Sequence, residues 1–389
     1  MGMLARTALA ALALPAALAA QSHFYVDVAT GVDVPSGGGA GAPWKTITYA
    51  ISQLDPDPLQ GPPATIHVAP GAYAPSTGEV FPLQFKGMLR VRSDAGFAYT
   101  VLDGEGAGVA LVNMSSTVGG YTGPLQPETE LVGFTLRNAH SGIALASSWN
   151  PVLPTLADLV IEQMTDAGVA GLTCCESAGT LKPLLVRVAI DACGVGIDWK
   201  LDGPSGSGLA LQDSFIANCA SDGLRSSGSS IAEAMLSRTR ITGNGGDAIH
   251  GAHSGNGGLE LSAEHCLIND NAGDGYDGGA QCGPTVSAQA TFVRCTIANN
   301  AGVGVRSLPS ATVAPNCIVV DTTTLASCIV YGNGDDLLPH PNFASLVIAH
   351  SDVGDGDLPS GGGGNFSADP LFAAPAAGDY RLSFGSPCA

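Results

Sequence analysis

The feature that most constrains this fold is a short segment that recurs seven times along the middle of the chain. Each copy has an apolar residue at its centre and polar residues around it. The centres are Leu136, Ile161, Ile190, Ile216, Ile241, Ile268 and Ile297, and they lie 25, 29, 26, 25, 27 and 29 residues apart. Self-similarity at such a period predicts a stacked solenoid, in which each repeat buries its apolar residues against its neighbours.

A second apolar residue follows each centre after seven or eight residues, usually directly behind a glycine. These pairs are Gly142-Ile143, Gly168-Val169, Gly196-Ile197, Gly223-Leu224, Ala248-Ile249, Gly275-Tyr276 and Gly304-Val305. The two apolar positions predict two strands with a corner between them in every coil, and hence a parallel β-helix with strands about 4.8 Å apart. The 53 glycines and 25 prolines argue against a helical solenoid, because both residues penalise helix interiors. We expect one all-β domain of about ten coils.

The ends of the chain differ from the repeats. Residues 1–20 combine Arg6, an Ala/Leu run and small residues at the end, which predicts a signal peptide and export to the cell surface or medium. The apolar run is too short for a membrane anchor. We assign residues 21–129 to an N-terminal cap with the first coils, 130–342 to the repeats, and 343–389 to the last coil and a closing segment. An amphipathic helix from Trp44 to Leu54 is expected to cover the open edge of the first coil.

The charge of the chain limits its partners. It has 34 acidic and 15 basic residues and a net charge of −19. Such a surface repels nucleic acid and anionic lipid, and it repels an acidic polysaccharide unless calcium bridges the two. A neutral glycan, a cation or a cell-surface protein is the easier partner, for a chain that we expect to be monomeric. No cofactor is required by this sequence, although calcium is a candidate.

The ten cysteines allow two interpretations. Cys266, Cys295 and Cys328 precede a strand centre at one offset, so they should stack on successive coils as buried thiols or as disulfides. Buried thiols are favoured there, and a disulfide is favoured between Cys174 or Cys175 and Cys282. Metal binding by cysteine is not expected, because the chain has no Cys-x-x-Cys pair.

Alignment of the coils stacks three carboxylates at one corner. Asp222, Asp247 and Asp274 each follow a strand centre by six residues. Each carboxylate can satisfy backbone N–H groups of the turn, which is the favoured interpretation. The alternative is a calcium site, since a divalent ion would relieve the repulsion between stacked carboxylates.

The same alignment forms a row of charged residues one position past the second apolar residue. The row is Arg225, His250, Asp277 and Arg306. A ladder of surface ion pairs is the favoured interpretation. The row is also the candidate catalytic set, because a histidine beside an aspartate can act as general acid or base and an arginine can hold a substrate carboxylate. Tyr276 is expected in the core, with its hydroxyl as an alternative substrate contact.

Coil-length variation concentrates just after the second strand, which is typical of a solenoid's binding wall. Trp149, Trp199 and Lys200 lie in or beside these loops. Tryptophan there can stack on a sugar ring or cover the edge of the core. These three residues and Tyr276 are the candidate substrate contacts.

Motifs at both ends of the chain carry a family resemblance. They are Phe24-Tyr25-Val26-Asp27, Gly31-Val32-Asp33, Pro43-Trp44-Lys45-Thr46-Ile47, the run from Ile66 to Tyr73, Glu79-Val80-Phe81-Pro82-Leu83, the run from Asn365 to Phe372, Gly378-Asp379-Tyr380-Arg381-Leu382 and Gly385-Ser386-Pro387-Cys388. The chain resembles secreted bacterial right-handed β-helix proteins of the pectate-lyase-like superfamily that begin with an N-terminal module of unknown function. That group includes polysaccharide lyases, hydrolases and epimerases, so the resemblance implies the fold and carries function only by analogy.

The chain departs from the enzymes of that group. The calcium-binding acids and the basic residue of the lyases have no residue-by-residue match, and the strands of the repeat contain no Asp-Asp pair as in the hydrolases. The leading expectation is therefore a module that contacts glycan or protein through one face. The alternative is a polysaccharide lyase or glycoside hydrolase that could depend on calcium.

Overall fold

The computed structural model describes most of the chain. The described residues are 22–54, 63–118, 121–173, 179–202, 206–254, 257–278, 286–307, 319–339, 344–356, 358 and 363–389. The segment 1–20, assigned to a signal peptide, and Cys174, Cys175 and Cys282 lie outside them. No helix among the described residues has the length and apolar character needed to cross a membrane.

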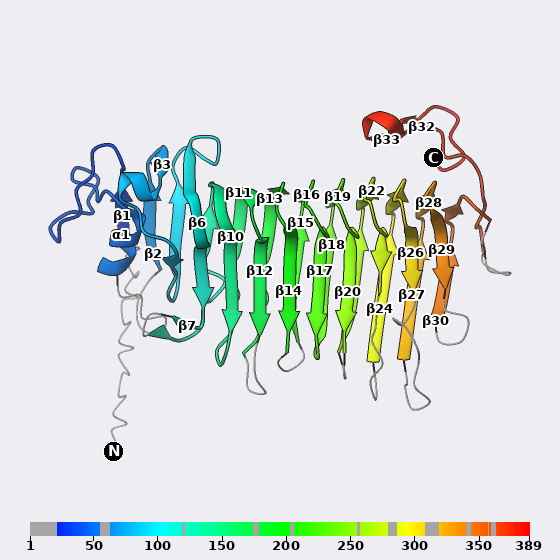
Figure 1. Ribbon diagram of the computed structural model, residues 1–389, viewed down its shortest axis with the longest axis horizontal. Coiled ribbons are helices and arrows are strands. Elements are labelled where there is room, and N and C mark those ends of the chain that lie inside the picture. The colour runs from blue at the N-terminus through cyan, green and yellow to red at the C-terminus, as the bar shows by residue number, and fades with distance from the viewer. Residues whose placement is uncertain are drawn as a thin grey trace, which may run out of the picture.

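The described chain winds as a parallel β-solenoid of about nine turns (Figure 1). Each turn contributes strands to three stacks. Stack A contains β4 (Leu83–Gln84), parts of β6 (Thr100–Ser115) and β10 (Thr135–Ser147), β12 (Ala167–Thr173), β14 (Val195–Leu201), β17 (Leu224–Gly228), β20 (Ile249–His253), β23 (Tyr276–Asp277), β26 (Val303–Ser307) and β29 (Asp335–Pro339).

The other two stacks complete the cross-section. Stack B contains β1 (Ser22–Val26), β2 (Ala64–Val68), β5 (Leu89–Ser93), β9 (Glu130–Val132), β11 (Thr155–Met164), β13 (Leu184–Asp191), β15 (Ser207–Gln212), β18 (Ile231–Ser237), β21 (Gly258–Glu264), β24 (Val286–Val293), β27 (Val319–Ala326) and β30 (Ala344–Ala349). Stack C contains β3 (Gly71–Tyr73), parts of β6, β10, β11 and β13, then β16 (Phe215–Ala217), β19 (Arg240–Thr242), β22 (Leu267–Asn269), β25 (Thr296–Ala298), β28 (Ile329–Tyr331) and β31 (Asp352–Val353).

Both predicted apolar columns are confirmed. The strand centres pair in one register through stack C, from Leu136 with Ile161 to Ile268 with Ile297, and all seven are at most 1% exposed. The second apolar residues pair in the same way through stack A, from Ile143 to Val305. The core is therefore a continuous interior that no single coil could bury alone.

A buried ladder of asparagines holds one corner of the coils together. The Oδ1 atom of Asn271 accepts from the backbone N–H of Asn244 at 3.1 Å and from its Nδ2 at 2.9 Å, and Asn271 binds Asn300 in the same way. The ladder continues to Cys219 on one side and to Asn333 on the other. Each amide thus satisfies backbone groups that the corner would otherwise leave unpaired.

The N-terminal end is capped, although the helix is shorter than predicted. α1 spans Ile47–Gln53, and its N-cap is Thr46, which accepts a hydrogen bond from the backbone N–H of Tyr49 at 3.2 Å. The segment before the helix covers the free edge of β1, because Trp44 exchanges backbone hydrogen bonds with Tyr25 and Asp27. Trp44 is 3% exposed, which fits the capping role expected for this region.

The C-terminal end folds back over the solenoid. β32 (Phe372–Ala374) and β33 (Asp379–Leu382) form an antiparallel hairpin, which Figure 1 shows above the ends of the later coils. The hydroxyl of Tyr380 donates to Asp270 at 2.7 Å and accepts from Asn299 at 2.8 Å. The closing segment therefore forms a hairpin against stack C and adds no full coil. The solenoid has about nine turns, whereas the sequence predicted about ten.

The stacked cysteines are free thiols, as favoured. Cys193, Cys219, Cys266, Cys295 and Cys328 are all buried and unbridged. Burial raises the pKa of Cys193 to about 12 and that of Cys219 to about 11. The raised pKa values make Cys193 and Cys219 weak nucleophiles, and all five side chains pack as small core residues.

Candidate functional site

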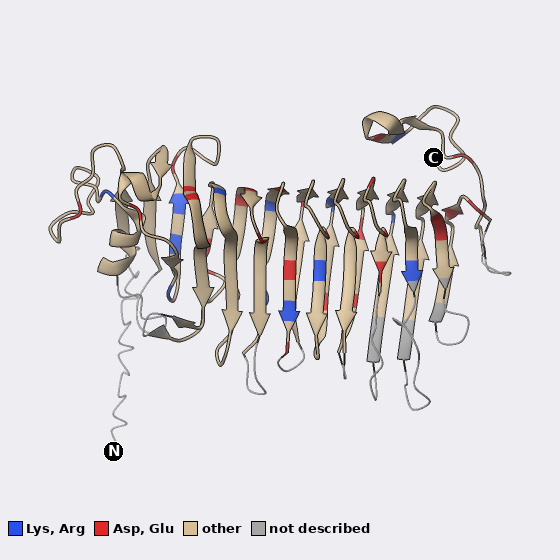
Figure 2. Ribbon diagram, viewed as in Figure 1, with Lys and Arg blue, Asp and Glu red and all other residues tan. Residues whose placement is uncertain are grey.

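The outer face of stack A carries the predicted charged row in register. Arg225 pairs with His250, His250 with Asp277, and Asp277 with Arg306 on successive strands. The row also includes Asp198, which pairs with Arg225 one coil earlier. Asp198 follows Gly196-Ile197 at the same offset, so extension of the sequence alignment by one coil would have found it. Figure 2 shows acidic positions on β14 and β23 and basic positions on β17 and β26.

The three corner aspartates stack beside this row. The Oδ1 atom of Asp222 accepts from the backbone N–H of Asp247 at 3.0 Å, and that of Asp247 accepts from Asp274 at 2.7 Å. The Oδ1 atom of Asp274 accepts in turn from the backbone N–H of Val303 at 2.6 Å. This is the geometry of the turn interpretation, in which each carboxylate satisfies the backbone of the next coil.

Glycines on the next coil make room for these carboxylates. A Cβ atom at Gly246 would lie 2.3 Å from Oδ1 of Asp222, and one at Gly273 would lie 2.2 Å from Oδ1 of Asp247. Gly302 stands in the same relation to Asp274 at 2.1 Å. An aspartate at this corner therefore requires a glycine before the corner residue of the following coil.

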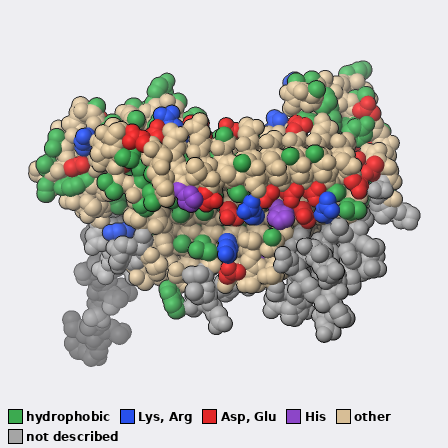
Figure 3. Space-filling view, in the orientation of Figure 1, with side chains coloured by type: hydrophobic (Ala, Val, Ile, Leu, Met, Phe, Trp, Pro, Cys, Tyr) green, Lys and Arg blue, Asp and Glu red, His purple; other side chains and the backbone are tan. Residues whose placement is uncertain are grey.

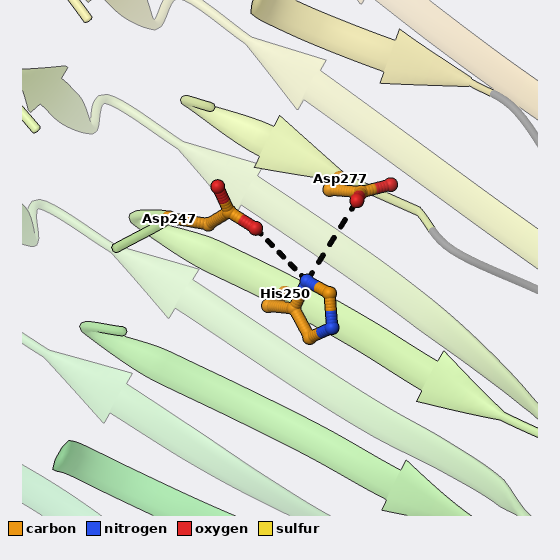
Figure 4. A group of neighbouring side chains, drawn as sticks. All are labelled: Asp247, His250 and Asp277. Carbon is orange, nitrogen blue, oxygen red and sulfur yellow. Dashed lines mark hydrogen bonds and ion pairs between the residues drawn. The ribbon is translucent and has the colours of Figure 1, made fainter. Parts of the chain in front are cut away.

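His250 lies between two carboxylates on neighbouring coils. Its Nδ1 atom is 2.9 Å from Oδ2 of Asp247 and 3.7 Å from Oδ2 of Asp277 (Figure 4). The hydrogen bond with Asp247 raises the pKa of His250 against the opposing effect of burial, and the charge of Asp277 adds to it. Burial acts to raise the pKa of Asp247, but the hydrogen bonds from His250 and from the backbone of Asp274 leave that pKa below its usual range.

The two arginines of the row pair with corner aspartates. Nε of Arg225 donates to Asp222 at 2.9 Å, and Arg306 binds Asp274 from the next coil. The hydrogen bond to Asp274 raises the pKa of Arg306. Asp198 forms no such ion pair with the described residues, and burial raises the pKa of its carboxyl while the charge of Arg225 partly offsets the rise. The row and the corner stack thus form one network, as the ladder interpretation expects.

We call this set the charged belt: Asp198, Asp222, Arg225, Asp247, His250, Asp274, Asp277 and Arg306. Figure 3 shows charged and histidine side chains gathered in a band along the middle of this face. The side chain of His250 is 30% exposed and that of Asp277 is 21% exposed. A ligand on this face could therefore reach the imidazole.

The belt offers acid–base chemistry at one atom. Since Nδ1 of His250 is engaged by the carboxylates, the other ring nitrogen is the one left to exchange a proton with a ligand, and Nε2 has no hydrogen-bond partner among the described residues. A carboxylate that holds one ring nitrogen fixes the orientation of the imidazole, as general acid–base catalysis requires.

One group in the belt has the spacing of a metal site. Single ligand atoms of Asp247, His250 and Asp277 lie within 4.8 Å of one another. The predicted calcium ligands Asp222, Asp247 and Asp274 instead use Oδ1 for backbone amides and Oδ2 for a neighbouring cationic side chain or imidazole. Calcium at the corner stack would compete with these hydrogen bonds and stays a prediction.

The predicted substrate contacts divide into exposed and buried residues. Trp149 is 65% exposed and Lys200 is exposed on β14, so both can meet a ligand. The expectation of a ligand contact is wrong for Trp199, which is 1% exposed and packs in the core beside Gly171. Trp199 alternates inward with Ile197 and Leu201, a period-two pattern that the sequence already contained. Tyr276 is fully buried against Phe292, as its core interpretation expected.

Comparisons with known proteins agree with the fold. Residues 29–179 match the family described as Protein of unknown function (DUF1565), and residues 190–344 match Right handed beta helix region. No curated protein matches this sequence.

Solved structures with a similar fold share little sequence with this chain. ORF18 of Geobacillus virus E2 is 11% identical with a TM-score of 0.52, and the alignment covers 84% of this chain and 61% of that one. The chain therefore spans less than two thirds of that protein. The pectate lyase Pel9A is 12% identical with a TM-score of 0.48, over 94% of this chain and 90% of the lyase. The A-module of the mannuronan C-5 epimerase AlgE4 from Azotobacter vinelandii is 13% identical with a TM-score of 0.39, over 78% and 79%.

The stacked parallel strands, the continuous apolar columns and the two family matches lead to one assignment. The chain folds as a right-handed parallel β-helix, with residues 190–344 matching the right-handed β-helix region and residues 29–179 matching the DUF1565 family.

Proposed function

We propose that this protein binds a polysaccharide along the charged belt of stack A. The observation that carries the proposal is the register of the belt, which places titratable and hydrogen-bonding side chains on five successive strands of one partly exposed face, from Asp198 on β14 to Arg306 on β26. A linear polymer that follows the solenoid axis would meet a charged or hydrogen-bonding side chain at each coil. Similar folds named as a pectate lyase and a mannuronan epimerase make a glycan a reasonable ligand class.

The charge of the belt favours a neutral glycan. Five aspartates stand against two arginines, and His250 adds a positive charge only when it is protonated. An acidic polymer would be repelled by the belt as by the rest of the chain, unless calcium bound between the two. Lys200 lies two residues after Asp198 on β14, and Trp149 follows the end of β10 with an exposed indole that can stack on a sugar ring.

A second candidate function is depolymerisation at the belt. It is favoured by the position of His250, whose Nδ1 is held by Asp247 and whose Nε2 is left for a ligand. In a lyase this nitrogen would take a proton next to a uronate carboxylate, and in a hydrolase it would assist proton transfer at the glycosidic bond. Either reaction would remove the activity from a His250→Ala variant but leave part of the binding.

The test is a glycan array followed by incubation with the bound polymers, with and without calcium. We expect binding to at least one neutral polysaccharide, and a tenfold or larger loss in the double variant His250→Ala, Asp277→Asn. His140→Ala is the matched control, because His140 is a half-exposed histidine that lies 3.6 Å from Asp166 and outside the belt. Equal binding by both variants, or no binding to any glycan, would contradict the proposal. Release of reducing ends or unsaturated products that stops on His250→Ala would establish the second function.

A further inference from the structure

The C-terminal hairpin forms a cavity against stack C, whereas the belt lies on stack A. It has a volume of about 490 Å³ and lies between the hairpin and the outer face of stack C. Its lining includes Arg240, His265, Arg294, Tyr380 and Arg381. Three arginines and a histidine converge here in a chain whose net charge is −19.

Arg240 differs from the other arginines of the molecule. The structure describes ten of the eleven arginines, and nine of them form an ion pair with a carboxylate. The guanidinium of Arg240 forms no ion pair and donates no hydrogen bond to any described residue, although its Nε is buried. Buried donors in native proteins nearly always have a partner, so an arginine without one inside a cavity points to a missing acceptor.

The neighbouring groups leave the cavity positive. Arg381 is bound to Asp379 at 2.7 Å, so these two charges offset each other. Arg294 is 4.0 Å from Glu264 and 63% exposed, which makes its ion pair weak. Arg240 and Arg294 therefore remain as cationic donors for a ligand, and His265 adds a third when protonated.

The wall of the cavity is fixed in place. Tyr380 is held to the solenoid by hydrogen bonds with Asp270 and Asn299. Gly378 lies against the guanidinium, because a Cβ atom there would be 3.2 Å from a terminal nitrogen of Arg240. Gly378 also has a φ of +73°, a conformation that glycine adopts without strain. The hairpin thus contacts the guanidinium of Arg240 but provides no hydrogen-bond acceptor for it among the described residues.

We propose that this cavity binds an oxyanion, a carboxylate or a sulfate, that is carried by a sugar-sized molecule. Guanidinium groups recognise both anions through paired N–H donors. The volume is within the range of small-molecule sites and exceeds what a bare anion fills. The proposal does not depend on polysaccharide binding at the belt, because the two sites share no residue.

The test is calorimetric titration of the whole protein with glucuronate, glucose 6-sulfate, inorganic sulfate and glucose. We expect glucuronate or glucose 6-sulfate to bind, glucose not to bind, and Arg240→Gln to weaken the affinity at least tenfold. Titration with inorganic sulfate distinguishes a free anion from an anion carried by a sugar. If inorganic sulfate binds as tightly as the sugar acids, the cavity is a site for the free ion and the proposal of a sugar-sized ligand is overturned.

Arg187→Gln is the matched control, since it removes one arginine from an exposed ion pair with Asp158 and away from the cavity. Both variants should retain the thermal transition of the unchanged protein, which separates lost binding from lost folding. No binding by the unchanged protein, or an equal loss of affinity in Arg187→Gln, would overturn the proposal.

Discussion

At the scale of single residues, the belt shows how one carboxylate can serve structure and chemistry together. Asp247 satisfies the backbone of the next coil with Oδ1 and holds His250 with Oδ2. The corner residues were predictable because aspartate at a turn has a known role and recurs at one offset. The position of His250 between Asp247 and Asp277 could not be predicted, because it depends on side-chain rotamers that an alignment of the repeats does not define.

The pair of Asp247 and His250 makes stability depend on pH. Because the folded state raises the pKa of His250, its contribution is complete below the unfolded value of 6.5 and is lost as pH rises through the folded value. The pKa of Asp247 is lowered, so its contribution is present above 3.8 and is lost as pH falls through the folded value. The pair is therefore strongest between these limits.

We expect His250→Asn to lower the free energy of unfolding by about 1 kcal/mol near pH 5.5, and by less at pH 8 and above. Urea unfolding of both proteins at several pH values measures the difference. His140→Asn should show a smaller and flatter difference, because His140 is 52% exposed. A gap between the two proteins that widens from pH 6 to pH 9 would contradict the assigned pairing.

Asn271 tests the buried ladder. Its amide accepts from Asn244 and donates to Asn300 and to backbone carbonyl groups, and it is 1% exposed. Asn271→Ala leaves several buried groups unpaired and should cost about 3 kcal/mol. Asn113→Ala is the control, because the Asn113 amide forms no side-chain hydrogen bond with the described residues. Equal melting temperatures of the two variants would show that the ladder is dispensable.

At the scale of elements, the sequence predicted two of the three stacks. The centres in stack C and the second apolar residues in stack A repeat at fixed offsets, and both columns are confirmed. The sequence did not predict stack B as a third set of strands. Its strands follow loops of varying length, so an alignment of the coils on their strand centres does not bring the residues of stack B into register. Trp199 is a related case, because its nearness to a loop predicts an exposed position, whereas its place in an alternating strand puts it in the core.

Gly171 tests the packing of one strand on the next. A Cβ atom there would lie 2.2 Å from the indole ring of Trp199, which fills the interior of the following coil. Gly171→Ala should lower the free energy of unfolding by about 1–3 kcal/mol, because a fully buried indole has no room to move aside. Gly108→Ala, in a strand where a Cβ atom meets no neighbour within 4 Å, should change stability little. Calorimetry measures the thermal transition of both variants. Equal transition temperatures would contradict the close packing of the Trp199 indole on Gly171.

At the scale of the whole molecule, the solenoid should tolerate the loss of a complete coil. Removal of residues 225–249 joins Leu224 to His250 and leaves Asp222 in the place of Asp247 beside the imidazole. We expect a folded, cooperative protein with a smaller urea m-value, because less surface is exposed on unfolding. Circular dichroism and urea titration measure both properties.

The control for the coil deletion is the removal of residues 225–236, which is half a coil and breaks the register of stacks A and B. This variant should lose the cooperative transition. Similar stability of the two deletions would show that the register between coils matters less than the repeat implies.

The belt as the ligand face is tested most directly by amide hydrogen–deuterium exchange, with and without a polysaccharide that the array identifies. We predict slower exchange in β14, β17, β20, β23 and β26 when the polymer is bound, and little change in stack B. Protection confined to the C-terminal hairpin or to stack B would contradict the account, because the polymer would then bind away from the belt.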